Sequence, residues 1–569
     1  MGQLDHKLLA AVSSKSSEEF YNSMPKGFKP GKTKLVFITG SVMSGLGKGI
    51  FTASLGRLLV DRGLNVRPMK LEAYLNVDAG TINPYRHGEV FVLDDGTETD
   101  MDLGTYERFL DVTLDKNSFV TSGRIYKNVI EKERRGNYLG RDVQFIPHVI
   151  GEAKFAVQSL AASSKADIVL VEIGGTVGDY ENLFAIEAMR KMLYELGHEN
   201  VCIVNLTYIL EPPNTGEFKS KAAQLGLRKL LELGTTPDVI VCRSHNKIPE
   251  KIREKISLNS GVPLTHVFGL NDINNIYKIP LFLRNLGVDE KVLEVLQLNK
   301  KYRADGSKKL KAWTSKNLIP KGKPVKIGII GKYTGLHDAY ISILKALEHC
   351  AATVKVPFSV EWIESVDLEK KSCKKLLEGI DGMIIPGGFG SRGIEGKIKA
   401  VNHARENKIP FLGLCYGFQM AVIEFARNAC GLKNSNTTEV DSKTKHPVIC
   451  ILPEQDEIEE LGGTMRLGGF NVVVEKNTLA HSLYKSEKVR ERFRHRYNVS
   501  TEFIELLESK GLVFSGKAPK KRIMQILELP KEKHPFFIAS QFHPEFTSRP
   551  LKPNPLFLGF YKACVSKKA

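Results

Sequence analysis

The chain of 569 residues has few cysteines and no long hydrophobic run, and both absences narrow its class. Eight cysteines without a close CxxC pair argue against a disulfide framework or a zinc ribbon. No stretch approaches the roughly 18 unbroken apolar residues that a membrane helix needs. The first residues carry charges where a secretory signal would be apolar. We therefore expect a cytoplasmic protein that has no membrane partner.

Acidic residues are scarce in one short segment, which explains much of the formal net charge of +18. Residues 300–326 contain ten Lys or Arg and one acid, Asp305, so half of the excess lies there. Positive charge of this size can indicate nucleic-acid binding, but a solvated linker explains such a concentrated run better. The modest remainder is typical of a protein that binds polyanionic small molecules such as nucleotides, and we expect no nucleic-acid partner.

Apolar, β-branched runs alternate with helical segments in two series, which predicts two α/β domains. The runs that we interpret as strands include 34–40, 166–175, 200–210 and 237–244 in the first series, and 325–333, 382–390, 410–415 and 536–546 in the second. Because these runs do not alternate strictly with polar residues, they favour parallel sheets buried on both faces. The expected divisions are an extension (1–32), a first domain (33–298), a basic linker (299–325) and a second domain (326–569).

One cysteine of the second series lies between two glycines, in the stretch Gly413-Leu414-Cys415-Tyr416-Gly417. The stretch follows a predicted strand and opens a predicted helix, which is the context of a nucleophile elbow with sulfur in place of oxygen. Side chains two residues before or after the nucleophile would collide in such a turn, so glycine is required there. The helix N-terminus favours a thiolate. The pattern predicts that Cys415 is a nucleophile.

A cysteine nucleophile needs a proton carrier, an orienting group and an oxyanion hole. The stretch QFHPEF, at the end of a predicted strand, provides His543 and Glu545. The glycine-rich stretch PGGFGSRG provides backbone N–H donors near Gly387. An isolated cysteine on a strand is usually structural. Here three motifs, the Cys415 turn, QFHPEF and PGGFGSRG, each lie at the carboxyl end of a predicted strand, and together they favour acyl transfer.

A glycine-rich loop in the first series, Gly40 to Gly49, follows a strand and opens a helix, as a phosphate-binding loop does. It departs from the strict pattern, because Val42 replaces a glycine and Gly49 replaces the hydroxyl residue that usually binds magnesium. Carboxylates must then bind the metal instead. The candidates are Asp102 and Glu172, which we place at strand-associated positions.

Longer motifs extend these observations to a family. The stretch around Cys415, completed by Gln419, resembles the G-x-C-x-G-x-Q signature of class I, triad-type glutamine amidotransferases. The segments LNVDAGTINPYRHGEVFVLDDGTETDMDLGTYERF, YLGRDVQFIPH, VEIGGTVGD and GGTMRLG resemble the CTP synthases, from about Lys34 to the C-terminus. The resemblance implies a Rossmann-like P-loop amidoligase domain followed by a flavodoxin-like class I glutamine amidotransferase domain.

The same resemblance implies a reaction and its ligands. CTP synthases phosphorylate O4 of UTP with ATP and Mg²⁺, and ammonia released from glutamine then displaces the phosphate. GTP is expected as an activator, CTP as an inhibitor, and a homotetramer as the assembly, with filaments in some members. Arg392 and Glu395 fall in the segment linked to GTP.

The residues below take their roles from the resemblance. The catalytic set is Cys415, His543, Glu545, Lys48 and Lys70, and the oxyanion and glutamine set is Gly387, Gly388, Phe389, Tyr416, Gln419, Glu439 and Arg496. ATP is expected at Ser44, Gly45, Leu46, Gly47, Lys48, Gly49, Arg243 and Asp272, and UTP or CTP at Ser44, Gln144, Asp179, Glu181, Lys219, Lys221, Gln224 and Lys255. The metal ligands are Asp102 and Glu172, and the ammonia passage includes His87 and Val90.

Several positions depart from the family pattern, and two other functions stay open. Glu72, Ala73, Asp142 and Ala222 replace the usual residues near the nucleotide sites, which bears on nucleotide affinity and CTP feedback. A related P-loop amidoligase, such as a cobyrinic acid synthase, would share both domains but not the pyrimidine motif. A nucleotide-sensing or filament-forming protein would be expected to lose some catalytic positions, and those that we compared are intact.

Overall fold

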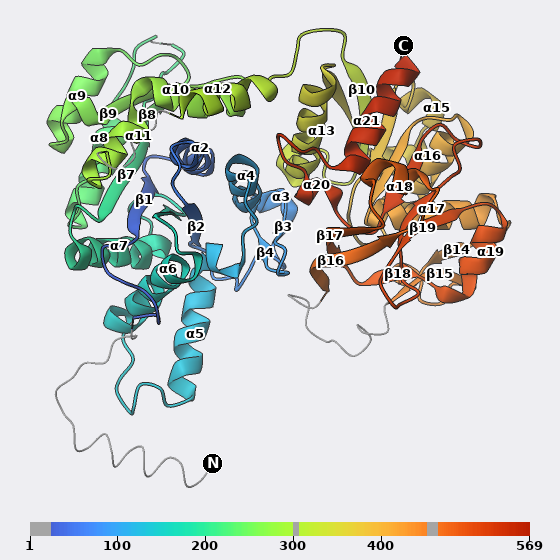
Figure 1. Ribbon diagram of the computed structural model, residues 1–569, viewed down its shortest axis with the longest axis horizontal. Coiled ribbons are helices and arrows are strands. Elements are labelled where there is room, and N and C mark those ends of the chain that lie inside the picture. Colours follow the sequence, from blue (N-terminus) through green and yellow to red (C-terminus); the bar gives the residue numbers. More distant parts are fainter. Residues whose placement is uncertain (1–23, 215, 300–305, 452–464, 569) are drawn as a thin grey trace. The chain divides into compact units, whose positions relative to one another are not determined.

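The computed structural model describes residues 24–214, 216–299, 306–451 and 465–568 (Figure 1). The chain divides into two compact units: Met1–Asp78 with Thr105–Thr314, and Ala79–Gly104 with Ser315–Ala569. Most of the predicted extension, residues 1–23, lies outside the described residues. Over the described ranges, no helix has both the length and the apolar character needed to span a bilayer.

The first unit is built on a seven-stranded sheet in the order β5-β2-β6-β1-β7-β8-β9, and each neighbouring pair is parallel. The strands are β1 (Lys34–Gly40), β2 (Val66–Glu72), β5 (Phe119–Thr121), β6 (Ile168–Ile173), β7 (Val201–Tyr208), β8 (Val239–Ser244) and β9 (Val267–Asn271). Leu35 and Phe37 of β1 share a core with residues of α6 (Ile150–Ser164) and α7 (Leu183–Leu196). Helix α2 (Lys48–Asp61) contacts β1, β2 and β6. The prediction of a buried parallel sheet is confirmed.

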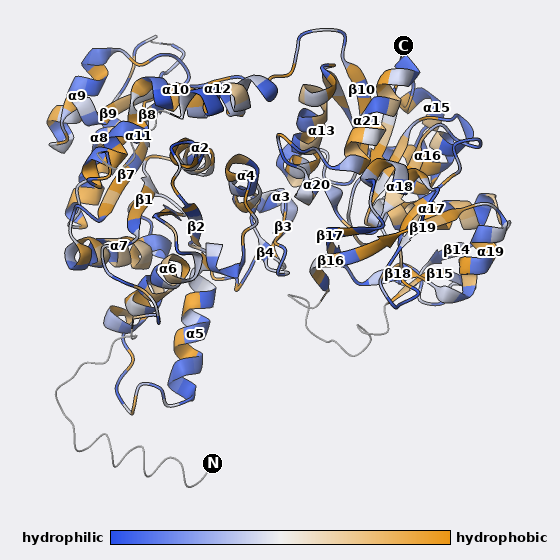
Figure 2. Cartoon of the chain, in the orientation of Figure 1, coloured by the Kyte–Doolittle hydropathy of each residue, from blue (hydrophilic) through white to orange (hydrophobic). Residues whose placement is uncertain are grey.

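The second unit contains a nine-stranded sheet in the order β11-β10-β12-β13-β21-β20-β19-β16-β17. Its parallel part consists of β10 (Val325–Gly331), β11 (Phe358–Glu364), β12 (Gly382–Ile385), β13 (Phe411–Leu414) and β21 (Phe537–Ser540). The rest pairs antiparallel: β16 (Arg466–Val474), β17 (Lys488–His495), β19 (Val513–Lys517) and β20 (Met524–Glu528). Figure 2 shows hydrophobic strands in the sheets of both units. The parallel part matches the predicted flavodoxin-like arrangement.

Residues 79–104 group with the second unit, although the sequence analysis placed them in the first domain. They form the short helix α3 (Pro84–His87) and a hairpin of β3 (Phe91–Val92) and β4 (Glu98–Thr99). Three arginines at alternate positions of β17 contact this hairpin: Arg490 pairs with Asp94 at 2.8 Å, Arg494 with Glu98 at 2.7 Å, and Arg492 donates to the Val92 carbonyl at 3.1 Å. The rings of Phe91 and Phe546 meet edge to face, with centroids 5.0 Å apart.

Part of the predicted basic linker is packed rather than solvated. Residues 300–305 lie outside the described ranges, but α12 (Ser307–Lys316) is a helix that buries Leu310 and Trp313. The Trp313 ring lies 5.5 Å, between centroids, from both Phe109 and Tyr277. The run of lysines therefore belongs to an amphipathic helix whose apolar side packs on the first unit.

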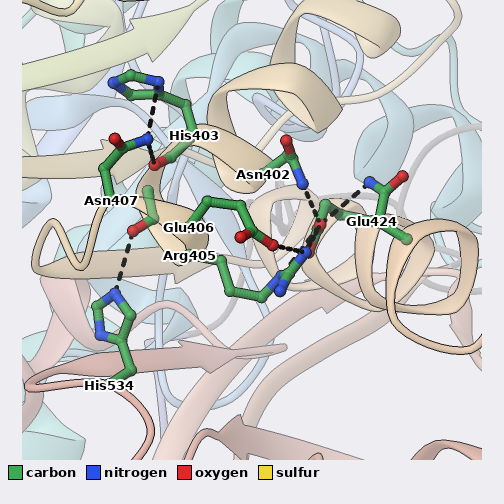
Figure 3. A network of polar contacts seen from close by, with 9 residues as sticks. Asn402, His403, Arg405, Glu406, Asn407, Glu424 and His534 are labelled. Atoms are coloured by element: carbon green, nitrogen blue, oxygen red, sulfur yellow. Dashed lines mark hydrogen bonds and ion pairs between the residues drawn. The ribbon is translucent and has the colours of Figure 1, made fainter.

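A buried carboxylate joins two helices of the second unit, α16 (Ile394–Glu406) and α17 (Tyr416–Asn428). Glu424 of α17 is fully buried and accepts hydrogen bonds from Asn402, Asn428 and the Arg405 guanidinium (Figure 3). Arg405 also pairs with the exposed Glu406 at 2.7 Å. Among the residues that the structure describes, Arg405 is the one cation paired with Glu424.

We expect Arg405→Met to lower the free energy of unfolding of the second unit by about 3 kcal/mol, because it leaves a buried carboxylate without a counter-charge. Unfolding of the full chain in urea, monitored as the loss of glutamine hydrolysis, measures this free energy. Glu406→Gln is the matched control, since it removes the exposed partner of the same arginine and is expected to change stability by less than about 0.5 kcal/mol. Equal effects of the two variants would contradict the assignment.

Candidate active site

Cys415 lies between β13 and α17, in a backbone conformation with φ 50° and ψ −96°. Positive φ is strained for a residue other than glycine and is a feature of functional sites. A Cβ on Gly413 would lie 2.8 Å from the Gly417 carbonyl oxygen, and one on Gly417 would lie 2.2 Å from that of Ile385. Both glycines are therefore needed for the chain to turn here, as the elbow pattern predicts.

His543 and Glu545 follow β21, the strand next to β13. The His543 Nδ1 and Glu545 Oε1 atoms are 2.7 Å apart, and both residues are buried. Burial lowers the pKa of His543, but the Glu545 carboxylate and the Cys415 sulfur outweigh this effect and raise the pKa to about 10. An imidazole with a raised pKa beside a thiol favours a thiolate–imidazolium pair. The structure thus brings the three predicted triad residues together.

The sulfur of Cys415 has two further polar neighbours. The thiol donates to the Arg494 carbonyl at 3.5 Å, and the Gln541 amide donates to the sulfur at 3.6 Å. Gln541 is not among the residues predicted from the sequence. It precedes His543 by two residues in QFHPEF, and this spacing next to the general base was the available signal.

A cavity of about 90 Å³ adjoins Cys415 and is lined by both segments of the second unit. Glu89 and Val90 come from the segment 79–104, while Gly387, Gly388 and His543 come from the segment after residue 315. Val90, predicted on the ammonia passage, therefore lies at the cavity next to the sulfur. His87 lies at the end of α3 and is exposed, outside the set of lining residues.

Of the remaining residues predicted to contact glutamine, Glu439 and Tyr416 contact the loop after β12. The Gly390 N–H donates to Glu439 Oε1 at 2.6 Å, and the Tyr416 hydroxyl donates to the Gly390 carbonyl at 2.8 Å. Phe389 is 54% exposed. Gln419 donates to the Tyr497 carbonyl at 3.2 Å. Arg496 lies between β17 and β18 (Tyr497–Val499).

In the first unit, the phosphate-binding loop joins β1 to α2 with Gly45 and Gly47 at positive φ. This places Ser44, Leu46 and Gly49 along the turn and the first helical residues. Lys48 is buried, and its ammonium donates to the Gly175 carbonyl at 2.7 Å.

Lys70 of β2 lies opposite Glu172 of β6 in the sheet register. Its ammonium is 3.3 Å from a Glu72 carboxylate oxygen and 3.8 Å from a Glu172 carboxylate oxygen. The Tyr106 hydroxyl also donates to Glu172. Glu72, which replaces the aspartate usual in the family, therefore pairs with a predicted catalytic lysine.

Arg243 and Asp272 lie beside the phosphate-binding loop. Arg243 donates to the Leu46 carbonyl at 2.8 Å and pairs with Asp272 at 2.9 Å. Burial raises the pKa of Asp272, but Arg243 and His245 outweigh it and leave the pKa lowered. A cavity of about 290 Å³ adjoins this pair, with Ile50, Phe51 and Ile276 in its lining. An apolar cavity beside a phosphate loop is suited to a purine base.

The residues predicted to bind the pyrimidine nucleotide lie at exposed or half-buried positions. Lys219 precedes α8 (Lys221–Glu232), Lys221 and Gln224 lie in its first turn, and Lys255 lies on α9 (Glu250–Ser260). Asp179 and Glu181 follow β6 and are exposed, as is Gln144 before η2 (Phe145–Val149). Gln144 hydrogen-bonds Asp142, one of the positions that depart from the family.

The two predicted metal ligands differ in their local setting. Glu172 is a strand residue, whereas Asp102 follows strand β4 (Glu98–Thr99) and lies in the first turn of helix α4 (Met101–Leu110). Apolar residues on both sides of this acid are helical rather than extended. Over the described ranges, no group of three or more His, Cys, Asp or Glu side chains gathers as a ready metal site. Carboxylate oxygens fit Mg²⁺ when phosphate oxygens and water complete its shell.

Both halves of the chain are similar to known proteins. A family model described as CTP synthase N-terminus matches residues 34–298, and one described as glutamine amidotransferase class-I matches residues 336–563. The chain is 50% identical to a CTP synthase of Caldanaerobacter subterraneus over 94% of this chain and 99% of that protein. It is 49% identical to a CTP synthase of Pyrococcus abyssi, over 94% and 98% of the two chains. A solved glutaminase domain of Trypanosoma brucei CTPS with bound acivicin is 38% identical, with a TM-score of 0.40, over 42% of this chain and 94% of that one.

Proposed function

The chain belongs to the CTP synthase family, and we propose that it converts UTP to CTP with ATP and with ammonia that its second unit releases from glutamine. The observation that carries this proposal is the Cys415–His543–Glu545 arrangement beside a cavity that residues 79–104 help to line. A glutaminase whose cavity is shared with a segment from the synthetase half of the sequence is suited to deliver ammonia rather than lose it.

In this proposal the Cys415 thiolate attacks the carboxamide carbon of glutamine, and the C–N bond then breaks. His543, held by Glu545, gives its proton to the leaving nitrogen, so that ammonia departs and a glutamyl thioester remains. Water, deprotonated by the same imidazole, hydrolyses the thioester. Glu439 binds the ammonium group of the substrate, and backbone N–H groups near Gly387 stabilise the oxyanion.

The first unit activates the pyrimidine. Lys48 and Lys70 neutralise the transferred phosphate, while Arg243 and Asp272 lie at the cavity proposed for adenine. Mg²⁺, where bound, would supply charge neutralisation between ATP phosphates, and Glu172 and Asp102 would hold it. Lys219, Lys221, Gln224 and Lys255 bind the phosphates of UTP in this proposal, and Gln144 lies in the UTP site. Asp179 and Glu181 hold the cytidine part of the inhibitor CTP.

Regulation and assembly follow the family in the same proposal: GTP activates, CTP inhibits, and the active form is a cytoplasmic homotetramer. Arg392, in the loop expected at the GTP-responsive segment, donates to the Lys332 carbonyl and lies 3.5 Å from Glu364. These contacts tie that segment to the strands that support the glutamine site.

Isotope transfer tests the proposal. The full chain, supplied with ATP, UTP and glutamine labelled with ¹⁵N at the side-chain amide, should produce CTP that carries the label on the base. Unlabelled CTP, or hydrolysis of glutamine without any CTP, would contradict it. Amidation of a corrinoid in place of UTP would favour the hypothesis of a cobyrinic acid synthase. Assembly of the protein without turnover would favour the hypothesis of a nucleotide-sensing or filament-forming protein.

A further inference from the structure

A lysine of the glutamine-binding unit is buried, although its side chain ends in a charge. Lys397 lies in the first turn of α16, and 1% of the residue is exposed. Ile394, Ile398 and Val401 of the same helix belong to the hydrophobic core. The charged end of Lys397 therefore occupies a place where its helix otherwise presents apolar groups.

The contact that the structure gives this ammonium is an aromatic face. Nζ of Lys397 lies 4.7 Å from the centroid of the Tyr416 ring, and a Cβ on Gly388 would lie 3.6 Å from the same atom. Over the described ranges, no carboxylate lies within ion-pair distance of it. A buried ammonium without a paired anion costs several kcal/mol, and a cation–π contact offsets only about 2 kcal/mol of this. Such a cost indicates a role beyond packing.

Four further charged groups influence Lys397 from the surrounding elements. Two are cationic, Lys332 after β10 and Arg392 in the loop after β12; two are acidic, Glu364 at the end of β11 and Glu439 after β14 (Ser435–Thr437). Burial lowers the pKa of Lys397 to about 7, since the two acids do not outweigh burial and the two cations.

Glu439 depends in turn on this lysine. Burial raises the pKa of the Glu439 carboxyl, and the opposing influences are the Gly390 N–H, Lys332 and Lys397. Lys332 shares this influence, but it is only half-buried, and its ammonium donates to the Phe389 carbonyl at 2.6 Å. Lys397 is the more deeply buried cation, and contacts connect it to the acid: the Tyr416 ring covers its ammonium, the Tyr416 hydroxyl donates to the Gly390 carbonyl at 2.8 Å, and the Gly390 N–H donates to Glu439 at 2.6 Å.

We propose that Lys397 is a positioning residue for glutamine: its ammonium, buried between Tyr416 and Gly388, keeps the Glu439 carboxylate ionised so that Glu439 can bind the ammonium group of the substrate. The inference rests on the proposed role of Glu439. It predicts that Lys397 lowers the KM for glutamine at pH values at which Glu439 can take up a proton.

The sign of the pH dependence follows from the two groups. At about pH 6 Lys397 is charged and opposes protonation of Glu439. As the pH rises through about 7, Lys397 loses its proton. At about pH 8.5 Lys397 is neutral, so its side chain no longer opposes protonation of Glu439. The contribution of Lys397 is thus confined to the acid side of neutrality.

The test is the KM for glutamine of the full-chain Lys397→Met variant, with saturating ATP and UTP. At about pH 6 we expect the KM of the variant to be about fivefold or more above that of the unmodified protein. At about pH 8.5 we expect the two KM values to agree within about twofold. Ammonia-dependent CTP formation should be unchanged, because it requires only the synthetase half, and an unchanged kcat for glutamine hydrolysis at about pH 8.5 reports correct folding of the second unit. Lys397→Gln is the second variant if the methionine does not fold.

Lys399→Met is the matched control, because Lys399 is an exposed lysine on the same helix that donates to the Glu369 carbonyl. It should leave KM unchanged at both pH values. A rise of KM that is the same at both pH values would overturn the inference, since it would indicate a structural role or direct binding of glutamine.

Glu439→Gln separates the inference from the proposal beneath it. We expect this variant to raise KM at both pH values and Lys397→Met to add nothing in its background. If Glu439→Gln raises KM while Lys397→Met is silent at about pH 6, the inference alone fails. An unchanged KM in Glu439→Gln would overturn the role of Glu439 and the inference with it.

Discussion

Replacement of Cys415 by alanine is expected to abolish glutamine-dependent CTP formation, by at least about 10³-fold, and to leave ammonia-dependent formation intact. The variant removes the sulfur that His543 activates, so that no thioester can form. External ammonia bypasses this step, because it requires only the synthetase half. Rates of CTP formation with glutamine and with ammonium chloride measure both activities in one preparation.

Cys430→Ala is the matched control for this prediction. Cys430 is a free, half-buried cysteine of the same unit that follows α17, the helix that Cys415 begins. We expect it to keep both activities. Loss of both activities in a folded Cys415→Ala protein would contradict the division of labour between the two units.

Lys48→Met is expected to have the opposite pattern, with CTP formation from either nitrogen source reduced by about 10³-fold and glutamine hydrolysis retained. In the structure the Lys48 ammonium lies at the start of α2 and donates to a backbone carbonyl. It is poised to exchange this contact for an anionic phosphate, and methionine preserves the length of the side chain without the charge. Phosphate release from ATP and glutamate release from glutamine, measured together, separate the two activities.

Lys127→Met serves as the control for the loss of a charge in the first unit. Lys127 lies on α5 (Ser122–Arg134), and its side chain is 57% exposed. Turnover should not change. If Lys48→Met formed CTP from ammonia at the normal rate, the glycine-rich loop would not be the phosphate site.

The features that could be predicted from the sequence are those fixed by neighbouring residues. The two glycines around Cys415 show, within five residues, that a side chain would collide at these positions. The strands of both sheets are apolar, so their burial can be predicted without knowledge of the strands beside them. Residues 79–104 could not be assigned in this way, because their packing depends on Arg490, Arg492 and Arg494, about 400 residues later.

Two further differences have a physical cause. The lysines of 307–316 suggest a solvated segment until Trp313 is seen to pack on Phe109. Lys397 resembles an ordinary surface lysine, and its one signal is its position on the same helix face as Ile394, Ile398 and Val401. In both cases charge concealed a buried face, since long side chains carry charge on an apolar stem.

The hairpin at 79–104 bears on how this protein can be divided. A fragment that starts after Thr314 would retain Cys415, His543 and Glu545 but would lose one wall of the cavity, and it would expose the guanidinium groups of β17 without Asp94 and Glu98. A fragment cut at the apparent domain boundary therefore lacks part of the lining of the cavity next to Cys415. Residues 79–104 belong to the first half of the sequence but form part of the second unit. If either half were exchanged with that of a distant relative, this hairpin would have to be exchanged together with the second unit.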